Sequence, residues 1–353
     1  MGKLAVYKYL SFMMLVFTVL VTAFVFFGLF GGYSNPATGT AMALLVYALP
    51  LLIIVEAVLL LFWLIRRRWH WAAIPAVTLL CCLPYLGTIY QFSLFSGADE
   101  ARTGVKVATY NVARFGREIN GAKAESILSI MRRQQADILC VQEYQENSGD
   151  TVNSGRFKSY FNHSAMGFED MMVFSRHPIV ASQIIDFGPN TNNSGMWADI
   201  DINGKVIRVF NIHLQTTGIN RTQRQLSKQA AQGSVVDNSR ILRSLYGSYT
   251  YGMGIRAQQA DLVKAEIENS PHPVIVCGDF NDVPYSYVYR TVKGDLVDGF
   301  KECGKGLMYT FNEGKKLVRI DYIFHSESME GCTYYKEDVN YSDHLPVFMN
   351  ISL

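Results

Sequence analysis

The stretch VIVCGDFN, residues 274–281, joins an apolar, β-branched run to a polar end. Val274–Cys277 has the composition of a buried strand, and the polar residues Asp279 and Asn281 follow it closely. Several other short apolar runs after residue 104 end in the same way, in a carboxylate, an amide or an imidazole. The recurrence predicts a layered domain whose strands place their polar residues at their ends.

Strands are expected at several places, with turn clusters such as 188–194 between some of them. They are Val105–Tyr110, Asp137–Gln142, Met171–Ser175, Met196–Ile202, Val206–Leu214, Val274–Cys277, Ile320–His325 and Val347–Ile351. Helical spacing of apolar residues occurs over Lys123–Arg133 and Arg256–Glu268. Because strands outnumber helices, we expect an α+β domain over residues 105–353 with mainly antiparallel sheets.

The polar residues near the strand ends share one chemistry. They are Asn111, Glu143, His213, Asp279, Asn281, Asp321, Asp343 and His344. Oxygen ligands from Asp, Glu and Asn suit Mg²⁺ or Mn²⁺, which also retain waters and substrate oxygens. Histidines exchange protons near neutral pH and donate to phosphate oxygens. The set predicts a divalent-cation site that acts on a phosphate ester.

In their order along the chain, these residues resemble the motifs of the endonuclease/exonuclease/phosphatase superfamily. The motifs are Tyr110-Asn111, Gln142-Glu143, Asn211-Ile212-His213-Leu214, Gly278-Asp279-Phe280-Asn281, Arg319-Ile320-Asp321-Tyr322-Ile323 and Ser342-Asp343-His344. The resemblance covers Val105 to Leu353 and implies a four-layer α/β sandwich, with two sheets face to face and helices outside. The superfamily includes DNase I-like nucleases, abasic-site endonucleases, inositol polyphosphate 5-phosphatases and bacterial sphingomyelinases. The substrate therefore stays open between a nucleic acid, a lipid and another phosphoester.

On the metal side of the site, the resemblance implies that Glu143 is the principal carboxylate ligand. Asn111 is implied nearby as a ligand or phosphate contact, and Asp343 as a further carboxylate. The implied cofactor is Mg²⁺, with Mn²⁺ as an alternative. The segment 110–114, YNVAR, lacks the Asn-Gly step of the abasic-site enzymes, which argues against a role in DNA repair.

On the catalytic side, the resemblance implies that Asp279 orients or deprotonates the attacking water and that Asn281 donates to a phosphate oxygen. His344 is similar to the histidine that contacts the scissile phosphate as acid or base. Asp321 is implied to hold that imidazole in one tautomer. His213 matches the second histidine of the DNase I and sphingomyelinase branches. A noncatalytic binding module on the same fold is the alternative, and no obligate protein partner is expected.

Residues 1–96 form an apolar block that we expect to be a membrane anchor. Its segments Leu10–Gly32, Ala41–Ile65 and Ala72–Phe92 are each long enough to cross a hydrocarbon core of about 30 Å. Glu56 is the acidic residue of the block and is expected to pair with a polar group or to have a function of its own. A linker is expected over residues 97–104, and residues 105–353 form the catalytic domain.

Basic residues predict the topology of this anchor. Lys3 and Lys8 precede the first segment, and Arg66–Arg68 separates the second from the third. The positive-inside rule puts both groups in the cytoplasm, so three crossings place the catalytic domain outside it. We expect a bacterial inner-membrane protein. If the third segment does not span, the catalytic domain is cytoplasmic instead.

Charge is unevenly distributed in the rest of the chain. The formal net charge of the whole protein is +2, and the part after residue 96 is close to neutral, which argues against duplex binding through overall charge. The segment 216–256 is the exception, because its basic residues far outnumber the single acid Asp237. Its basic residues are Arg221, Arg224, Lys228, Arg240, Arg243 and Arg256. It is either a solvated excursion or a basic lip for an anionic substrate or lipid headgroups.

The six cysteines show no metal-binding spacing. Cys140 and Cys277 lie in runs that are expected to be buried strands. Cys303 and Cys332 could pair if the domain is exported, although free thiols are the expectation for all six.

Overall fold

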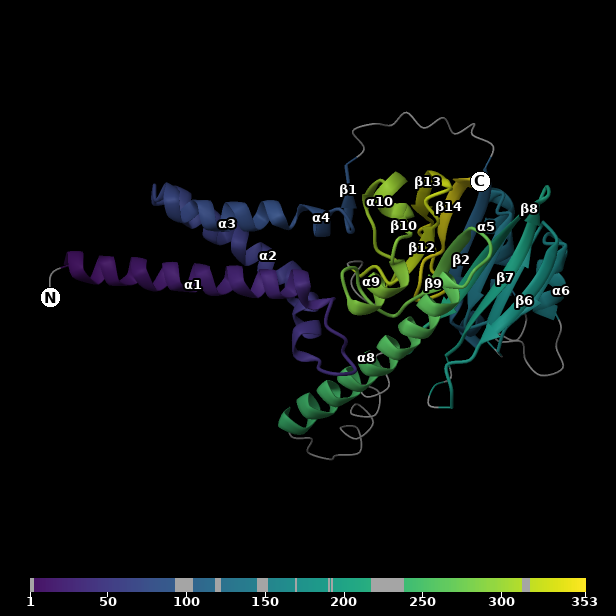
Figure 1. Cartoon of the computed structure of the whole chain (residues 1–353), viewed down its shortest axis with the longest axis horizontal. Coiled ribbons are helices and arrows are strands. Elements are labelled where there is room, and N and C mark those ends of the chain that lie inside the picture. The colour runs from purple at the N-terminus through teal and green to yellow at the C-terminus, as the bar shows by residue number, and fades with distance from the viewer. Residues whose placement is uncertain are drawn as a thin grey trace.

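The computed structural model describes residues 3–92, 104–117, 122–144, 152–168, 170–189, 191, 193–216, 238–312 and 318–353. The apolar N-terminal helices lie on one side of the molecule, and a two-sheet domain with its own helices lies on the other (Figure 1). The N-terminus is at the far end of the helices, whereas the C-terminus lies within the domain.

The first sheet has the strand order β13-β14-β2-β3-β5-β4. Its strands are β13 (Glu330–Lys336), β14 (Val347–Ser352), β2 (Val105–Asn111), β3 (Ile138–Gln142), β5 (Met171–Ser175) and β4 (His163–Met166). β2 and β3 are parallel, and the other neighbours are antiparallel.

The second sheet has the order β10-β12-β9-β8-β7-β6. Its strands are β10 (Val297–Asp298), β12 (Asp321–His325), β9 (Val274–Asp279), β8 (Lys205–His213), β7 (Gly195–Ile202) and β6 (Ile179–Ile185). Here β8 and β9 are parallel, and the other neighbours are antiparallel. Both sheets are therefore mixed but mainly antiparallel, as expected.

The two sheets pack face to face through one side of each strand. Because side chains alternate along a strand, Val107, Cys140, Val209 and Cys277 all enter the core between the sheets. Helices α5 (Ala122–Gln134) and α6 (Val152–Lys158) cover the first sheet, and α8 (Asn238–Glu268) and α9 (Tyr287–Lys293) cover the second. The smaller η1 (Ala113–Arg117), α10 (Gly299–Cys303) and β11 (Gly306–Leu307) lie in connections. The four expected layers are confirmed.

The apolar block consists of α1 (Lys3–Gly31), α2 (Ala41–Ile65), α3 (Trp69–Cys81) and α4 (Leu83–Leu86). Three helical stretches, 6–31, 41–65 and 69–86, are long and apolar enough to cross a membrane. The third differs from the expected Ala72–Phe92. It is interrupted at Cys82, because Pro84 lacks the N–H that would continue the hydrogen bonds of the helix. It ends at Leu86, before Gly87.

Glu56 of α2 is fully buried among the apolar helices. Thr22 of α1 donates a hydrogen bond of 2.7 Å from Oγ1 to Glu56 Oε1, and Thr78 Oγ1 of α3 lies 3.4 Å from Thr22 Oγ1. The acid therefore has the polar partner that was expected.

The apolar helices are docked onto the two-sheet domain. Tyr90–Gln91 (β1) pairs with β11, so residues that were expected to end the third span belong to a small sheet instead. Arg290 of α9 donates from NH2 to Leu29 O at the end of α1, with a distance of 2.9 Å. Arg319 donates from NH1 to Thr88 O over 3.1 Å. Of the expected linker, residues 97–103 lie outside the described residues.

The cysteines are all free in the structure, and Cys303 and Cys332 do not form a disulfide. Cys140 of the first sheet and Cys277 of the second both lie in the buried core between the sheets, as their positions in apolar runs predicted.

Candidate active site

Strand register brings three of the expected residues side by side. His213 at the end of β8 pairs with Asp279 of β9, and Asp279 pairs with Asp321 at the start of β12. All three continue the strand face that Val209 and Cys277 present to the core. The candidate site therefore lies at the end of the space between the two sheets.

Asn111 links this row to the other sheet. It ends β2, and its Nδ2 lies 3.1 Å from Asp279 Oδ2 and 3.3 Å from Glu143 Oε1. Its Oδ1 accepts a hydrogen bond from Ala113 N. Glu143 follows β3 with a φ of 50°, in the left-handed region that non-glycine residues rarely adopt. Such backbone strain is characteristic of functional sites.

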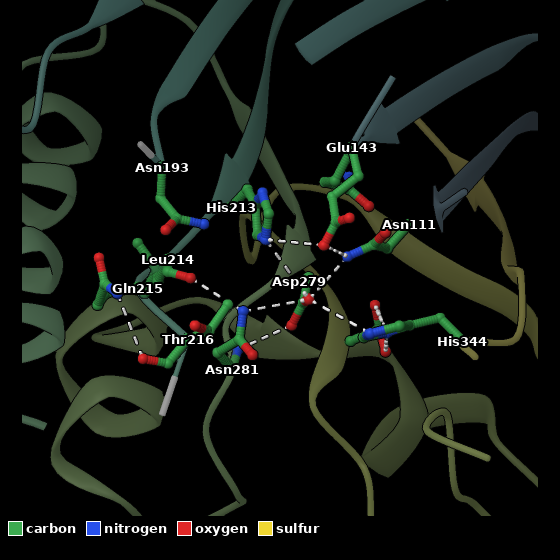
Figure 2. A network of polar contacts seen from close by, with 12 residues as sticks. Asn111, Glu143, Asn193, His213, Leu214, Gln215, Thr216, Asp279, Asn281 and His344 are labelled. Carbon is green, nitrogen blue, oxygen red and sulfur yellow. Dashed lines mark hydrogen bonds and ion pairs between the residues drawn. The ribbon is translucent and has the colours of Figure 1, made fainter. Parts of the chain in front are cut away.

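Asp279 is the centre of the network (Figure 2). Its Oδ1 accepts a 2.8 Å bond from Asn281 N, and its Oδ2 lies 3.2 Å from Asn281 Nδ2. Asn281 Nδ2 also donates to Leu214 O, which fixes the Asn281 side chain between the loop after β8 and the loop after β9. Asp279 is 1% exposed, and burial raises the pKa of its carboxyl. The Asp279 carboxylate thus accepts hydrogen bonds from Asn111 of the first sheet and from Asn281, which follows β9 of the second sheet.

His344 lies on the other side of Asp279. Its Nδ1 is 3.0 Å from Asp321 Oδ2, while its Nε2 is 3.6 Å from Asp279 Oδ2. Burial alone would lower the pKa of His344, but the charges of Asp321 and Asp279 outweigh it and raise the pKa to about 10. The imidazole is therefore held in one orientation and favours its protonated form.

The three residues Asp279, Asp321 and His344 are also close enough to hold a metal ion. However, His344 Nδ1 already faces Asp321, and Nε2 already faces Asp279. This pattern is typical of a carboxylate-oriented acid–base histidine, so we interpret the cluster as proton-transfer machinery rather than as the principal metal site.

Asp170 is a site residue that the sequence analysis missed. Its Oδ2 lies 3.3 Å from His213 Nδ1, and His213 Nε2 lies 3.9 Å from both Glu143 Oε1 and Asp279 Oδ2. Burial would lower the pKa of His213, but the bond to Asp170 and the charges of Asp279 and Glu143 raise it. Asp170 belongs to no recognised motif, and its position directly before β5 was the available signal.

Asp343 lies beside this network rather than at its centre. Its Oδ1 is 3.2 Å from Ser342 Oγ, which donates to Asn111 O over 2.7 Å. Ser342 Oγ also accepts a bond from His344 N, so the Ser-Asp-His turn is tied to the end of β2. The structure thus brings together Asn111, Glu143, His213, Asp279, Asn281, Asp321 and His344, with Asp343 adjacent.

Arg256 does not belong to a basic lip, which was one of the two interpretations of the segment 216–256. Its guanidinium is fully buried, with Nε 3.2 Å from Asp282 Oδ2 and NH1 donating to Gln215 O. It is therefore a structural ion pair and not a free cation for substrate. Residues 221, 224 and 228 of the same segment lie outside the described residues.

The charge of the site fits a divalent cation. Its described carboxylates are Glu143, Asp170, Asp279, Asp321 and Asp343, against the imidazoles of His213 and His344. Such a set repels a phosphate group unless a cation offsets it. Oxygen donors suit Mg²⁺ or Mn²⁺, and His213 Nε2 is a buried polar atom that lacks a protein hydrogen-bond partner. The residues present therefore fit a metal.

The two-sheet fold and the acidic, histidine-containing site are those of a phosphoesterase family, and comparison with known proteins identifies that family. Residues 108–344 match the family model described as Endonuclease/Exonuclease/phosphatase family, so the chain belongs to that family. Its members are phosphoesterases, including nucleases and phosphatases, and they typically use divalent metals. Residues 8–89 match a domain of unknown function. No protein of curated function matches the sequence significantly.

Solved structures share the fold. A family protein from Bacteroides thetaiotaomicron has a TM-score of 0.50 at 18% identity, covering 70% of this chain and 95% of that one. One from Beutenbergia cavernae has a TM-score of 0.51 at 17% identity, covering 70% and 71%. Danio rerio TDP2, complexed with a single-strand DNA product, has a TM-score of 0.50 at 17% identity, covering 71% and 100%. These likenesses show the fold alone.

Proposed function

We propose that this chain is a membrane-anchored, divalent-metal-dependent phosphoesterase that hydrolyses a phosphodiester or phosphomonoester by in-line attack of water. The observation that carries the proposal is the position of Asp279, whose carboxylate lies within 4 Å of Asn111, His213 and His344. A buried carboxylate with a raised pKa beside two histidines suits proton transfer.

Glu143, Asn111 and Asp343 would hold Mg²⁺ or Mn²⁺ in this proposal. The bound metal would supply charge stabilisation for the phosphoryl oxygens and the leaving group. Glu143 is accessible to a metal ion, because its side chain is 29% exposed beside the buried His213. Asn111 Nδ2 orients the carboxylates of Glu143 and Asp279, so it also positions the ligand set.

The remaining residues move protons and orient the substrate. Asp279 orients the attacking water and accepts its proton. His344, held by Asp321, presents Nε2 to the phosphate as donor and acid. Asn281 exchanges its bond to Asp279 for a phosphate oxygen when substrate binds. His213, held by Asp170, donates from Nε2 to a second phosphate oxygen.

The location we propose is a bacterial inner membrane with three crossings. The basic residues Lys3, Lys8 and Arg66–Arg68 support a cytoplasmic N-terminus and an extracytoplasmic catalytic domain. The lengths and apolar compositions of the three helical stretches support the crossings.

A lipid phosphodiester is the substrate class that the docking of the helices favours. Tyr47 of α2 donates a hydrogen bond to Asp282, next to Asn281, so the site adjoins the first turns of an apolar helix. A substrate in the same bilayer would be held near the site at a high effective concentration. A nucleic acid is the alternative substrate class, and the following experiment tests both classes.

The test uses the full-length protein in nanodiscs with Mg²⁺ and three substrates: bis(p-nitrophenyl) phosphate, supercoiled plasmid, and vesicles of phosphatidylinositol phosphate and sphingomyelin. We expect Mg²⁺-dependent turnover that His344→Ala lowers by about 10²–10⁴-fold. Glu143→Gln should raise the Mg²⁺ concentration needed for half-maximal rate by about 10–100-fold. His272→Ala, which alters a histidine outside the site, should retain wild-type turnover.

Plasmid nicking without lipid hydrolysis would make the protein a nuclease and reject the lipid substrate. A folded wild-type protein with no Mg²⁺-dependent turnover on any of these phosphoesters would instead support the noncatalytic binding module.

A further inference from the structure

Helix α8 carries one apolar face along its length, and only part of that face is covered. At about 100° per residue, Tyr246, Tyr249, Met253 and Ala260 fall on the same side of the helix. Met253 and Ala260 are buried against the rest of the molecule, with exposed fractions of 2% and 0%. One and two turns before Tyr249, the same face is open: Tyr246 is 56% exposed and Leu242 is 68% exposed.

The face becomes exposed beside the apolar helices. Tyr249 packs edge-on against Tyr47 of α2, with ring centroids 5.3 Å apart. Gly254 lies against Ala37 in the loop between α1 and α2. Figure 1 shows the N-terminal end of α8 projecting from the domain toward the side of these helices.

The depth of Tyr47 relates this face to a bilayer. A hydrocarbon core of about 30 Å needs roughly 20 helical residues. Counted back from Ile65, which precedes the arginines 66–68, such a length reaches Val46. Tyr47 is therefore at the expected boundary of the hydrocarbon core, where tyrosine is favoured. The Tyr249 contact puts α8 at the same depth.

The composition of residues 238–251 matches this position. The stretch contains Arg240 and Arg243, with no aspartate or glutamate, and its apolar side chains are leucines, an isoleucine and tyrosines. Basic residues together with amphipathic aromatic residues are typical of helices that lie at a lipid surface. An anionic headgroup layer complements both the charge and the open apolar face.

From these contacts, we propose that residues 238–251 of α8 form an interfacial helix, whose occupant is the anionic headgroup layer of the bilayer that holds α1–α3. The proposal rests on the membrane location proposed above. It concerns a surface separate from the catalytic residues. The open face of Leu242 and Tyr246 enters the headgroup region, and the opposite face, which carries the 65% exposed Tyr251, remains in water.

The same helix is bonded to the candidate active site. Arg256 donates from NH1 to Gln215 O over 2.9 Å, and Gln259 Oε1 accepts a 2.8 Å bond from Gln215 N. Gln215 lies two residues after His213. A helix that rests on the bilayer thus holds the His213 loop close to the lipid headgroups, where a lipid phosphoester is present.

The test is lipid photocrosslinking of the full-length protein in vesicles of phosphatidylcholine and phosphatidylglycerol. Tyr246→p-benzoylphenylalanine and Tyr251→p-benzoylphenylalanine form a matched pair, because both replace an exposed tyrosine of the same helix on opposite faces. We expect lipid adducts, counted by mass spectrometry, to be roughly fivefold or more abundant at 246 than at 251, since only one face of an interfacial helix enters the lipid.

A third variant, Ile54→p-benzoylphenylalanine, separates the possible failures. Ile54 is a 62% exposed residue of α2 within the proposed crossing. Adducts at 54 with equal or no adducts at 246 and 251 would overturn the interfacial helix and leave the membrane location standing. Crosslinks from 246 to a second copy or within the chain would overturn it too. Absence of adducts at 54 would contradict the membrane location and this proposal together. Crosslinking needs no turnover, so none of these results depends on the phosphoesterase activity.

Discussion

Tyr47 of α2 donates a hydrogen bond from its hydroxyl to Asp282 Oδ1, three residues after Asp279. The other carboxylate oxygen of Asp282 lies 3.2 Å from Arg256 Nε, and the Asp282 carbonyl accepts a bond from Tyr322 OH. An apolar helix is therefore joined to the loop that carries Asp279 and Asn281 by a direct polar contact.

Removing this contact should slow catalysis. For Tyr47→Phe, we expect turnover to fall by roughly tenfold, equivalent to about 1.4 kcal/mol, because the loop loses a bond to a charged acceptor. The measurement is kcat of the full-length protein in nanodiscs. Tyr287→Phe is the matched control, since it removes bonds to Asn35 and Asp261 at the same docking surface without touching Asp282. Equal kcat losses in the two variants would contradict a specific role for Tyr47.

Asp170 should act by orienting His213. For Asp170→Asn, we expect kcat to fall by about 10–100-fold with KM nearly unchanged, because the imidazole loses the carboxylate at Nδ1. The pKa of His213 should also fall, so any limb of the pH–rate profile that reports it should move to lower pH. A variant with lower thermal stability but an unchanged pH profile would show that Asp170 is merely structural.

The pH dependence of stability should report the pair His344 and Asp321 in the metal-free protein. The pKa of His344 is raised to about 10, above its value of about 6.5 in an unfolded chain. A raised folded pKa gives stability that is fully present below about pH 6.5 and is lost as pH rises toward 10. Asp321→Asn should lower this pKa, so the loss of Tm between these pH values should be smaller than in wild type. The measurement is the Tm of wild type and of Asp321→Asn in EDTA at a series of pH values between about 6.5 and 10. Parallel curves of Tm against pH for the two proteins would refute the pairing of His344 with Asp321 as the cause.

Gly278 should be intolerant of a side chain. Its φ is +140°, and a Cβ at this position would lie 1.9 Å from Ile212 O in the neighbouring strand β8. Backbone strain alone costs about 1–3 kcal/mol, and the overlap would add to it, so Gly278→Ala should lower Tm strongly. Gly204→Ala also has a positive φ but open space around the Cβ, and it should lower Tm much less. A similar Tm for the two variants would contradict the steric cause.

The central strands were predictable because they are buried on both faces. Met171–Ser175 coincides with β5, and the predictions for β3 and β7 differ from the structure by a residue at one end. The edge strand β6 (Ile179–Ile185) was missed, because most of its side chains face water and leave no apolar run to detect. The N-terminal half of α8 was also missed, since Gly247, Gly252 and Gly254 weaken its helical signal.

The candidate site was predictable where a residue lies at the start or the end of a recognisable strand. Asp279 and Asp321 belong to such motifs, and their pairing in the sheet brings them together. Asp170 was missed, because its position directly before β5 is a weak signal by itself and its role depends on a contact with His213 of the other sheet. The burial of Arg256 was hidden for the same reason, since its partner Asp282 lies far along the chain.

The docking of the apolar helices has a consequence for proteolysis. Arg290 binds Leu29 O, Arg319 binds Thr88 O, and β1 pairs with β11, all independently of the peptide bonds between residues 92 and 104. A cut in that stretch would leave two pieces that still hold each other through these contacts. Proteolytic clipping there would therefore not shed the phosphoesterase domain from its helices.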